Sequence, residues 1–327
     1  MNTGLKKSIE ILAGQFAKRN WSYLDVPPGD RREKTYRWPG KAEERIMICV
    51  HKGAEIRELF HRQDFFFFNF AYCGNYGAIS YQYDNHIIVH ENECYIGQPH
   101  AGYALYADEP KDIIIIGILI QKEAFFRTFL PVLSSDGKLF RFFLDPQTNA
   151  YSEEYIRLRF DEPAAVHCLL ELMVMEYAWP KEDTQDILQP LVLALLMLVA
   201  RQYRESFPAP ENEPLSDKII RYMGEHSDVV SLKDIARHFS YHPNYISNLL
   251  RRETGSSFSE LLTQQRMERA LTLLRGTTLS IEEIAAMLGY SNSSNFYKAF
   301  REYYHASPRE YEQRFSAGRG GAPPRRR

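Results

Sequence analysis

Polar and cationic residues recur in two short segments near the carboxyl end of this 327-residue chain. The first segment carries Asn244, Ser247, Asn248 and Arg251, and the second carries Ser294, Asn295, Lys298 and Arg301. Base edges and phosphates in duplex DNA are contacted by such side chains, because short amides and hydroxyls read hydrogen-bonding groups while cations neutralise phosphate. The residue types therefore favour a nucleic-acid-binding surface, with an ordinary solvated surface as the alternative.

An internal repeat places these polar residues on predicted helices. Residues 231–239 align with residues 280–288, and each copy opens with a serine three positions before an acid. That spacing is typical of a capping box at a helix start. Apolar residues at i, i+3, i+4 and i+7 then mark one face of a short helix in each copy. A polar turn and a second helix follow both times, so the sequence predicts two helix-turn-helix units.

Each second helix has its own start and core signals. Pro243 suits the first helical position of copy one, and Gly255 suits the residue after its end. The predicted core positions are Ile246, Leu249 and Leu250 in copy one, and Phe296, Ala299 and Phe300 in copy two. Between the copies, residues 258–274 change their apolar face midway, which predicts a helix that joins two separate cores. Two matching copies favour DNA binding more strongly than one copy would.

Residues 215–314 resemble the DNA-binding region of the AraC/XylS family of bacterial transcription regulators. The motifs are RRETGSSFSELLTQQRMERALTLL, IEEIAAMLGYSNSSNFYKAFREYY and SPREY, whose combined spacing is more specific than a lone helix-turn-helix. The resemblance implies an all-α double helix-turn-helix domain whose two recognition helices enter adjacent segments of the major groove. It implies base contacts from Asn244, Ser247, Asn248, Ser294, Asn295 and Lys298, and phosphate contacts from Arg251, Arg252 and Arg301. His305 stands where the family usually has glycine, and histidine is less suited to a left-handed helix cap.

The amino-terminal part has a different pattern. Residues from about 45 to 120 contain short apolar or aromatic runs broken by turn signals, which predict a β-barrel or sandwich. This zone is similar to the cupin-type sensor domain common in the family. Gly53, His61, Gln63, Phe67 and Gly74 occupy the positions of the first cupin motif, so only His61 remains of three metal ligands. We expect no metal and no cofactor, and catalysis of the cupin type then lacks its Lewis acid.

The aromatic residues of the predicted barrel suggest an effector pocket. The candidates for its lining are His61, Tyr72, Tyr81, Tyr83 and Tyr103. Apolar walls with a few polar anchors are typical of small-molecule sites, although the same aromatics could simply fill a small barrel. Two other functions stay open: a barrel enzyme fused to a DNA-binding module, and a small-molecule-binding scaffold whose helical half pairs with protein.

Two long helices are predicted at residues 162–179 and 184–205, with Pro180 ending the first. Both are apolar over more than one stripe, which indicates burial on two sides. They pack either on their own barrel alone or also on a second copy of the chain, and we predict a homodimer. The apolar run at 187–200 is shorter than the roughly 20 residues of a membrane span, so no membrane partner is expected.

The predicted organisation is therefore multidomain. It comprises a cupin-like effector domain at 1–160, a helical dimerisation segment at 161–205, a linker at 206–214, a DNA-binding domain at 215–315 and a disordered tail at 316–327. Residues 215–327 hold 17 Lys and Arg against 12 Asp and Glu, whereas residues 1–214 hold 23 against 30. A basic carboxyl-terminal part favours an anionic partner. Four scattered cysteines and the lack of a signal-peptide pattern predict a cytoplasmic protein.

These observations predict a sequence-specific DNA-binding transcription regulator that is not an enzyme. Its predicted partner is double-stranded DNA, and RNA polymerase and a small-molecule effector are further candidates.

Overall fold

The computed structural model describes residues 3–19, 21–24, 35–80, 85–133, 139, 142, 143, 155–207, 213–277 and 279–311. The chain forms two compact units, one of residues 1–133 with 149–208 and the other of residues 134–148 with 209–327. The pocket candidates Tyr81 and Tyr83, and the predicted tail at 316–327, lie outside the described residues.

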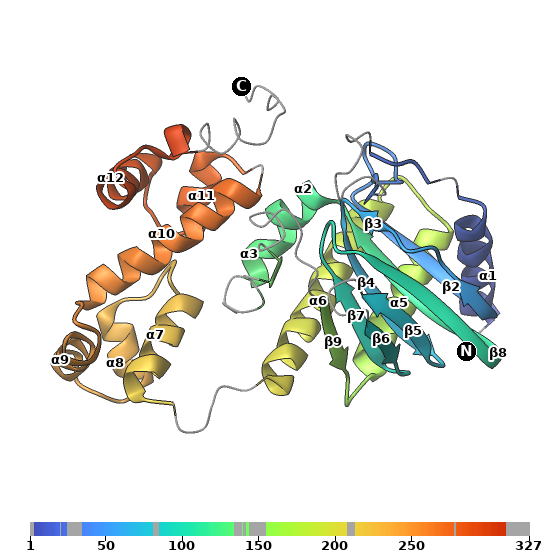
Figure 1. Cartoon of the computed structure of the whole chain (residues 1–327), viewed down its shortest axis with the longest axis horizontal. Coiled ribbons are helices and arrows are strands. Elements are labelled where there is room, and N and C mark those ends of the chain that lie inside the picture. Colours follow the sequence, from blue (N-terminus) through green and yellow to red (C-terminus); the bar gives the residue numbers. More distant parts are fainter. Residues whose placement is uncertain are drawn as a thin grey trace. The chain divides into compact units, whose positions relative to one another are not determined.

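Antiparallel strands dominate the first unit (Figure 1). The strands are β1 (Thr35–Tyr36), β2 (Ile46–Arg57), β3 (Arg62–Gln63), β4 (Phe66–Cys73), β5 (Tyr76–Ser80), β6 (Asn85–Val89), β7 (Glu93–Gly97), β8 (Tyr103–Ile120) and β9 (Tyr155–Arg159). The short strands β1 and β3 pair with each other in parallel. The remaining strands form one seven-stranded sheet in the order β6-β5-β8-β4-β7-β9, and β2 pairs with β8 outside that path.

Strand β8 organises the sheet, because its two halves pair with different neighbours. Its first residues pair with β5 and its last residues with β4, while β2 follows it along both halves. The sheet thereby curls into a nearly closed barrel, which confirms the predicted amino-terminal β-barrel.

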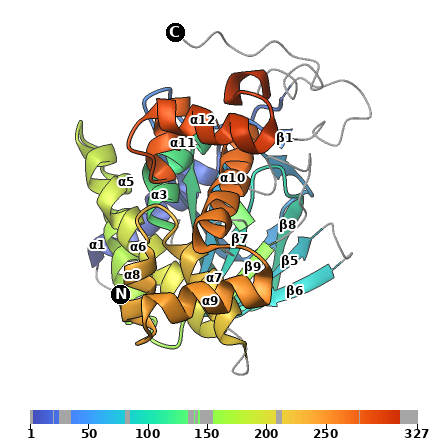
Figure 2. The ribbon, with the colours of Figure 1, turned by 90° about the vertical axis from the view of Figure 1, so that its left-hand side faces the viewer.

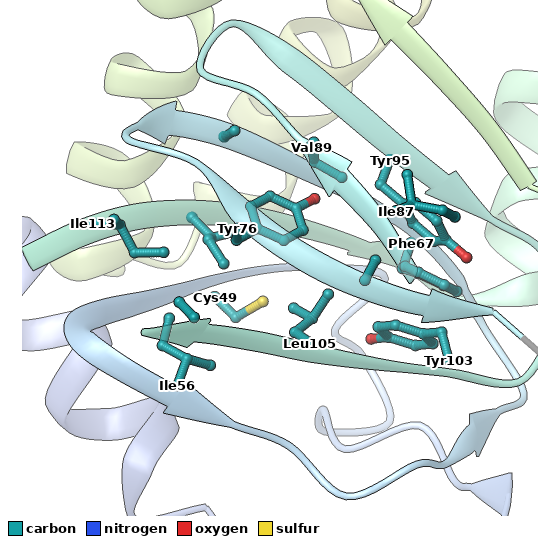
Figure 3. Packing of buried hydrophobic residues seen from close by; sticks show 14 of the residues in the cluster. Cys49, Ile56, Phe67, Tyr76, Ile87, Val89, Tyr95, Tyr103, Leu105 and Ile113 are labelled. Carbon is teal, nitrogen blue, oxygen red and sulfur yellow. The ribbon is translucent and has the colours of Figure 1, made fainter. Parts of the chain in front are cut away.

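Aromatic residues from β4, β7 and β8 fill one end of the barrel (Figure 3). Phe67 and Tyr103 stack with ring centroids 4.3 Å apart, and Tyr95 stacks on Tyr103 at 6.1 Å. A side chain at Gly97 would begin 1.9 Å from the Phe67 ring, so glycine is required there. The barrel interior is therefore close-packed at this end.

Helices cover part of the barrel. They are α1 (Thr3–Ala17), α5 (Ala164–Ala178) and α6 (Thr184–Ser206), and three short helical segments follow β8: α2 (Lys122–Ala124), the π-helix η2 (Phe125–Phe129) and α3 (Leu130–Leu133). Helix α1 packs on β2 and α5, and α5 packs on α6. Helices α5 and α6 are the two long helices that the sequence predicts.

Helix α6 is tied to strand β2 by one side chain. The Oε1 atom of Gln185 accepts hydrogen bonds from the backbone nitrogens of Arg45 and Ile46, at 2.9 and 3.0 Å. Its Nε2 atom donates to the carbonyl oxygen of Ile46 at 2.9 Å. Gln185 therefore holds the start of α6 against the start of β2.

Among the described residues, α6 is the one helix that is long and apolar enough to cross a membrane. The core helix of a soluble protein passes the same test, and α6 buries Leu188, Val192, Leu195 and Val199 inside its own unit. This helix alone is weak support for a membrane span.

The second unit is helical. Its helices are α7 (Leu215–Glu225), α8 (Leu232–His238), α9 (Pro243–Thr254), α10 (Phe258–Gly276), α11 (Ile281–Met287) and α12 (Ser293–Tyr304). Helix α10 lies between the α8–α9 pair and the α11–α12 pair (Figure 2). Its first half packs Phe258, Leu261 and Leu262 against the core of α7, α8 and α9. Its second half buries Met267 and Ala270, so the predicted change of face is confirmed.

The predicted capping boxes are present in both copies. The Ser231 side chain accepts from the Asp234 backbone nitrogen at 3.3 Å, and Ser280 accepts from Glu283 at 3.2 Å. Each acid bonds back to the backbone nitrogen of its serine. These reciprocal bonds satisfy otherwise unpaired donors at the helix starts, and they explain why α8 and α11 begin where the serines predict.

Candidate nucleic-acid interface

Helices α9 and α12 present corresponding faces to the solvent. In α9, Ile246, Leu249 and Leu250 are buried, and in α12 Phe296 and Phe300 are buried. The side chain of the residue before each helix accepts a backbone hydrogen bond. The Asn244 nitrogen donates to His242 Nδ1 at 3.3 Å, and the Asn295 nitrogen donates to Asn292 Oδ1 at 2.8 Å. Pro243 occupies the first turn of α9 as predicted.

The polar residues predicted from sequence lie mostly on these exposed faces. Those that are exposed are Asn244, Asn248, Arg251, Arg252, Ser294, Asn295, Lys298 and Arg301. Ser247 is only half-exposed. The structure thus gathers four of the predicted residues on the exposed face of α9 and four on that of α12.

His305 follows α12 in the left-handed conformation, with φ 55° and ψ 22°. Its backbone nitrogen donates to the carbonyl oxygen of Arg301 at 2.9 Å. Histidine is among the non-glycine residues that tolerate this region better than most. The departure from glycine therefore leaves the helix ending intact, and α12 ends at Tyr304.

The sequence reasoning missed a tyrosine on α9. Tyr245 is 45% exposed and stacks on Tyr241, which is 44% exposed, with ring centroids 4.9 Å apart. Counted from the first buried residue of each helix, Tyr245 holds the position of Asn295. The first helices of the two copies are 49 residues apart and the second helices are 50 apart, because the turn of copy two is one residue longer. The sequence analysis selected only short polar and cationic side chains on the exposed face, so the aromatic Tyr245 was left out.

Two of the predicted contact residues already make local bonds. Asn295 Nδ2 donates to Ser291 Oγ at 3.0 Å, which orients its amide. Arg252 Nη2 lies 3.0 Å from Glu253 Oε1. Glu253 therefore neutralises part of the charge that Arg252 would offer to a phosphate.

A buried joint connects the two helix-turn-helix copies. Arg269 of α10 donates to Gly224 O at 2.8 Å and to Ser227 Oγ at 2.6 Å. Burial lowers the pKa of Arg269 to about 10, so it remains charged near neutral pH. Arg266 donates through Nε to Ser227 O at 2.6 Å, and its guanidinium lies 5.3 Å from the centre of the Tyr290 ring. These contacts fix the loop after α7 against α10 and the turn of copy two.

Gly289, which begins that turn, completes the joint. It has φ 77°, and a Cβ atom there would lie 1.8 Å from the carbonyl oxygen of Asp228. Only glycine fits this conformation and this close approach. The separation of α9 from α12 is therefore set by rigid contacts.

The barrel unit contains a cavity of about 270 Å³. It is lined by Phe16, Ala17, Arg19, Trp21, Tyr36, Cys49, His51, Glu58, Leu59, His61, Gln63, Asn69, Tyr103 and Leu119. The predicted pocket residues His61 and Tyr103 are among them. Tyr72 is not, because its hydroxyl donates to Glu171 Oε1 at 2.7 Å and its ring lies against His167 on α5.

Burial governs the charges around this cavity. Burial lowers the pKa of His51 and of His61 to about 4, so both imidazoles are neutral near pH 7. Burial raises the pKa of Glu58 to about 7, and a backbone hydrogen bond involving Leu105 acts in the opposite direction. Within the described part of the chain, no group of three or more His, Cys, Asp or Glu residues is arranged to hold a metal ion.

Comparison with known proteins identifies the carboxyl-terminal part. Residues 235–314 match the family model described as a helix-turn-helix domain. The regulatory protein PocR of Salmonella typhimurium is 36% identical over 110 residues, which cover 33% of this chain and 36% of PocR. The HTH-type transcriptional regulator GadX of Escherichia coli O6:H1 is 40% identical over 84 residues, covering 26% of this chain and 30% of GadX.

Among solved structures, the carboxyl-terminal domain of AraT, a response regulator from Geobacillus stearothermophilus, is 34% identical. The match covers 32% of this chain and 88% of that one, with a TM-score of 0.30. The fold, the family model and the similarity to PocR and GadX define a double helix-turn-helix domain in the second unit. This domain is of the AraC type, as the sequence motifs predict. The chain spans less than half the length of PocR and of GadX.

Proposed function

We propose that this chain is a sequence-specific regulator of transcription that binds double-stranded DNA through α9 and α12. The observation that carries the proposal is the repeated exposed face, presented twice and held at a fixed separation by α10 and the Arg269 joint. Two recognition helices on one rigid domain suit successive segments of the major groove.

We assign base contacts to Asn244, Ser247, Asn248, Ser294, Asn295 and Lys298, and phosphate contacts to Arg251, Arg252 and Arg301. Asn248 and Lys298 occupy equivalent positions on exposed helix faces, which supports a shared role. An asparagine in the major groove selects adenine and a lysine selects guanine. The two copies would then read different bases.

The proposal is tested by binding of the full chain to fragments of its own upstream DNA at several salt concentrations. We expect a steep loss of affinity with salt, because phosphate contacts release counterions. Asn248→Ala and Lys298→Ala should each cost about 1–3 kcal/mol and relax preference at single base positions. Gln264→Ala and Lys218→Ala, on α10 and α7, are the matched controls. Equal affinity for upstream and random duplex would overturn the proposal.

We also propose that the chain forms a homodimer through the outer face of α6. Ile187 and Met197 are 38% and 55% exposed on this helix, and Leu191 and Ala194 between them are half-exposed. Such a stripe loses water when a second copy covers it. Light scattering at micromolar concentration should give a dimer mass for the chain and a monomer mass for Met197→Glu, with Gln202→Glu as the control. A monomer mass for the unchanged chain would refute the dimer.

The barrel unit would hold a small-molecule effector in its cavity and bias the arrangement of the DNA-binding unit. RNA polymerase is the further partner that a regulator of transcription would meet, and we place the protein in the cytoplasm. Catalysis is not part of this proposal, and the relatives that match the chain are named as regulators.

A further inference from the structure

The cavity of the barrel unit contains one carboxylate among its described lining residues, Glu58. Its Oε1 atom lies 3.4 Å from Nε2 of His51. Its Oε2 atom is buried and has no hydrogen-bond partner among the described residues. A buried carboxylate oxygen without a partner is costly and needs a donor.

Two buried amides line the same cavity. The side chains of Gln63 and Asn69 are each 2% exposed. Gln63 Nε2 has no hydrogen-bond partner within the described chain, whereas the Asn69 side chain hydrogen-bonds with Tyr103. The Gln63 amide nitrogen is a donor, so it needs an acceptor. The cavity thus has a vacant acceptor on Glu58 and a vacant donor on Gln63.

Aromatic rings complete the lining. Trp21 lies against Tyr36 with ring centroids 5.0 Å apart, Tyr36 against His61 at 4.6 Å, and His61 against Tyr103 at 4.7 Å. The faces of Trp and Tyr rings attract cations, most strongly where water is excluded. A carboxylate beside several ring faces is an environment that selects a positive charge.

We propose that this cavity binds a small organic cation, an ammonium group on a short skeleton that also carries a hydrogen-bond acceptor. The ammonium group pairs with Glu58 beside the aromatic rings, and the acceptor receives a hydrogen bond from Gln63. This proposal deepens the effector role proposed above and rests on it. Glu58 disfavours an anionic ligand, and a neutral molecule of the same shape is the alternative that the experiment separates.

The cavity lining also holds the titratable groups His51, His61, Tyr36, Tyr103 and Cys49. The two histidines are neutral near pH 7 because burial lowers their pKa to about 4. Arg19 is the cation of the lining, and its Nη1 atom donates to the carbonyl oxygen of Pro39 at 2.9 Å rather than to Glu58.

The test compares cations with neutral molecules of nearly the same shape. Isothermal titration calorimetry on the full chain uses choline against 3,3-dimethyl-1-butanol, and tyramine against 4-(2-hydroxyethyl)phenol. We expect at least one of the two cations, choline or tyramine, to bind about tenfold or more tightly than its neutral counterpart. Equal binding of the two members in both pairs, or no binding of either cation, would overturn the proposal.

Glu58→Gln removes the charge and keeps the shape. We expect this variant to bind amine and neutral molecule within about threefold of each other, because only the charged partner is lost. Glu55→Gln is the matched control, since Glu55 is an exposed carboxylate on β2. Continued discrimination by Glu58→Gln would contradict the assignment, while the wild-type comparison stands even if this variant folds poorly.

Choline also provides a pH test, because its charge is permanent. With a Glu58 pKa of about 7, the ionised fraction rises about tenfold between pH 6 and pH 8. The choline affinity of the wild type should rise by a similar factor, and that of Glu58→Gln should stay flat. An affinity that is flat in both proteins counts against Glu58.

The same preparations are assayed for binding to their own upstream DNA. Specific DNA binding without amine binding rejects the ligand class and leaves the proposed function standing. If the unchanged chain shows no specific binding to this DNA, the proposed function is rejected whatever the calorimetry shows.

Discussion

The two helix-turn-helix copies share one framework and differ in what they expose. Ile246 and Leu250 of α9 are buried at the same helix positions as Phe296 and Phe300 of α12. The exposed positions differ: Tyr245 corresponds to Asn295, Asn248 to Lys298, and Arg252 to Glu302. Apolar residues therefore hold both helices in the same way, while the exposed residues differ between the copies, as the proposal that they read different bases requires.

The copies also differ at the residue that follows the first helix. Ser240 in copy one and Gly289 in copy two occupy the same place after the first helix, both in the left-handed region, with φ 59° and 77°. Ser240 accommodates a side chain there. Gly289 cannot, because Asp228 of the other copy lies against it. The comparison indicates that only the turn of copy two is part of the joint between the copies.

The largest expected effect is that of Gly289→Ala. The new methyl group would meet a backbone oxygen at a left-handed residue, so we expect the free energy of unfolding to fall by roughly 2–5 kcal/mol. Gly255→Ala is the matched control, because Gly255 has φ 75° and nothing within 4 Å of its Cβ position. It should cost only about 1 kcal/mol. Urea denaturation measures both, and equal losses would show that the joint is loose.

A smaller effect is expected from the arginines that follow the base-reading positions. Arg251→Ala and Arg301→Ala should weaken binding evenly across DNA sequences. Each should also reduce the slope of log affinity against log salt concentration by about one, since one phosphate contact is lost. Arg252→Ala should lower the slope less, because Glu253 already pairs with that guanidinium. Fluorescence anisotropy between low and moderate salt gives these slopes. A larger change for Arg252→Ala than for Arg301→Ala would contradict the neutralisation of Arg252 by Glu253.

The smallest expected effect concerns the residues that cap α9 and α12. Asn292→Ala should lower the free energy of unfolding by about 1 kcal/mol, as is typical for loss of a helix cap. His242→Ala should cost less, because its hydrogen bond is 3.3 Å long against 2.8 Å for Asn292. Thermal denaturation of the two variants makes the comparison, and a greater loss for His242→Ala would reverse the ranking.

The helical unit was largely predictable, because its signals are local. The capping serines mark the starts of α8 and α11, and the periodic apolar residues mark the buried faces. What was missed in this unit is Tyr245, since only short polar and cationic side chains were selected as candidates on the exposed face. The contacts of Arg269 with residues 42 and 45 positions away were also beyond a local pattern.

The apolar runs predicted that the first unit is a β-barrel, but they did not predict which residues line its cavity. Strand β4 is buried on both faces, with Phe66 and Phe68 on one side and Phe67 and Asn69 on the other, so no alternation reveals which residues point inward. Tyr72 therefore looked like a lining residue. Glu58 was not among the candidates, because its place in the cavity depends on the pairing of β2 with β8 over a long sequence separation.

The Gln185 clamp has a mechanical consequence. Strand β2 contributes Cys49 and His51 to the cavity wall, and its first residues are bonded on both the N–H and C=O sides to the start of α6. If the proposed effector displaced this wall, the hydrogen bonds of Gln185 would couple that displacement to the start of α6.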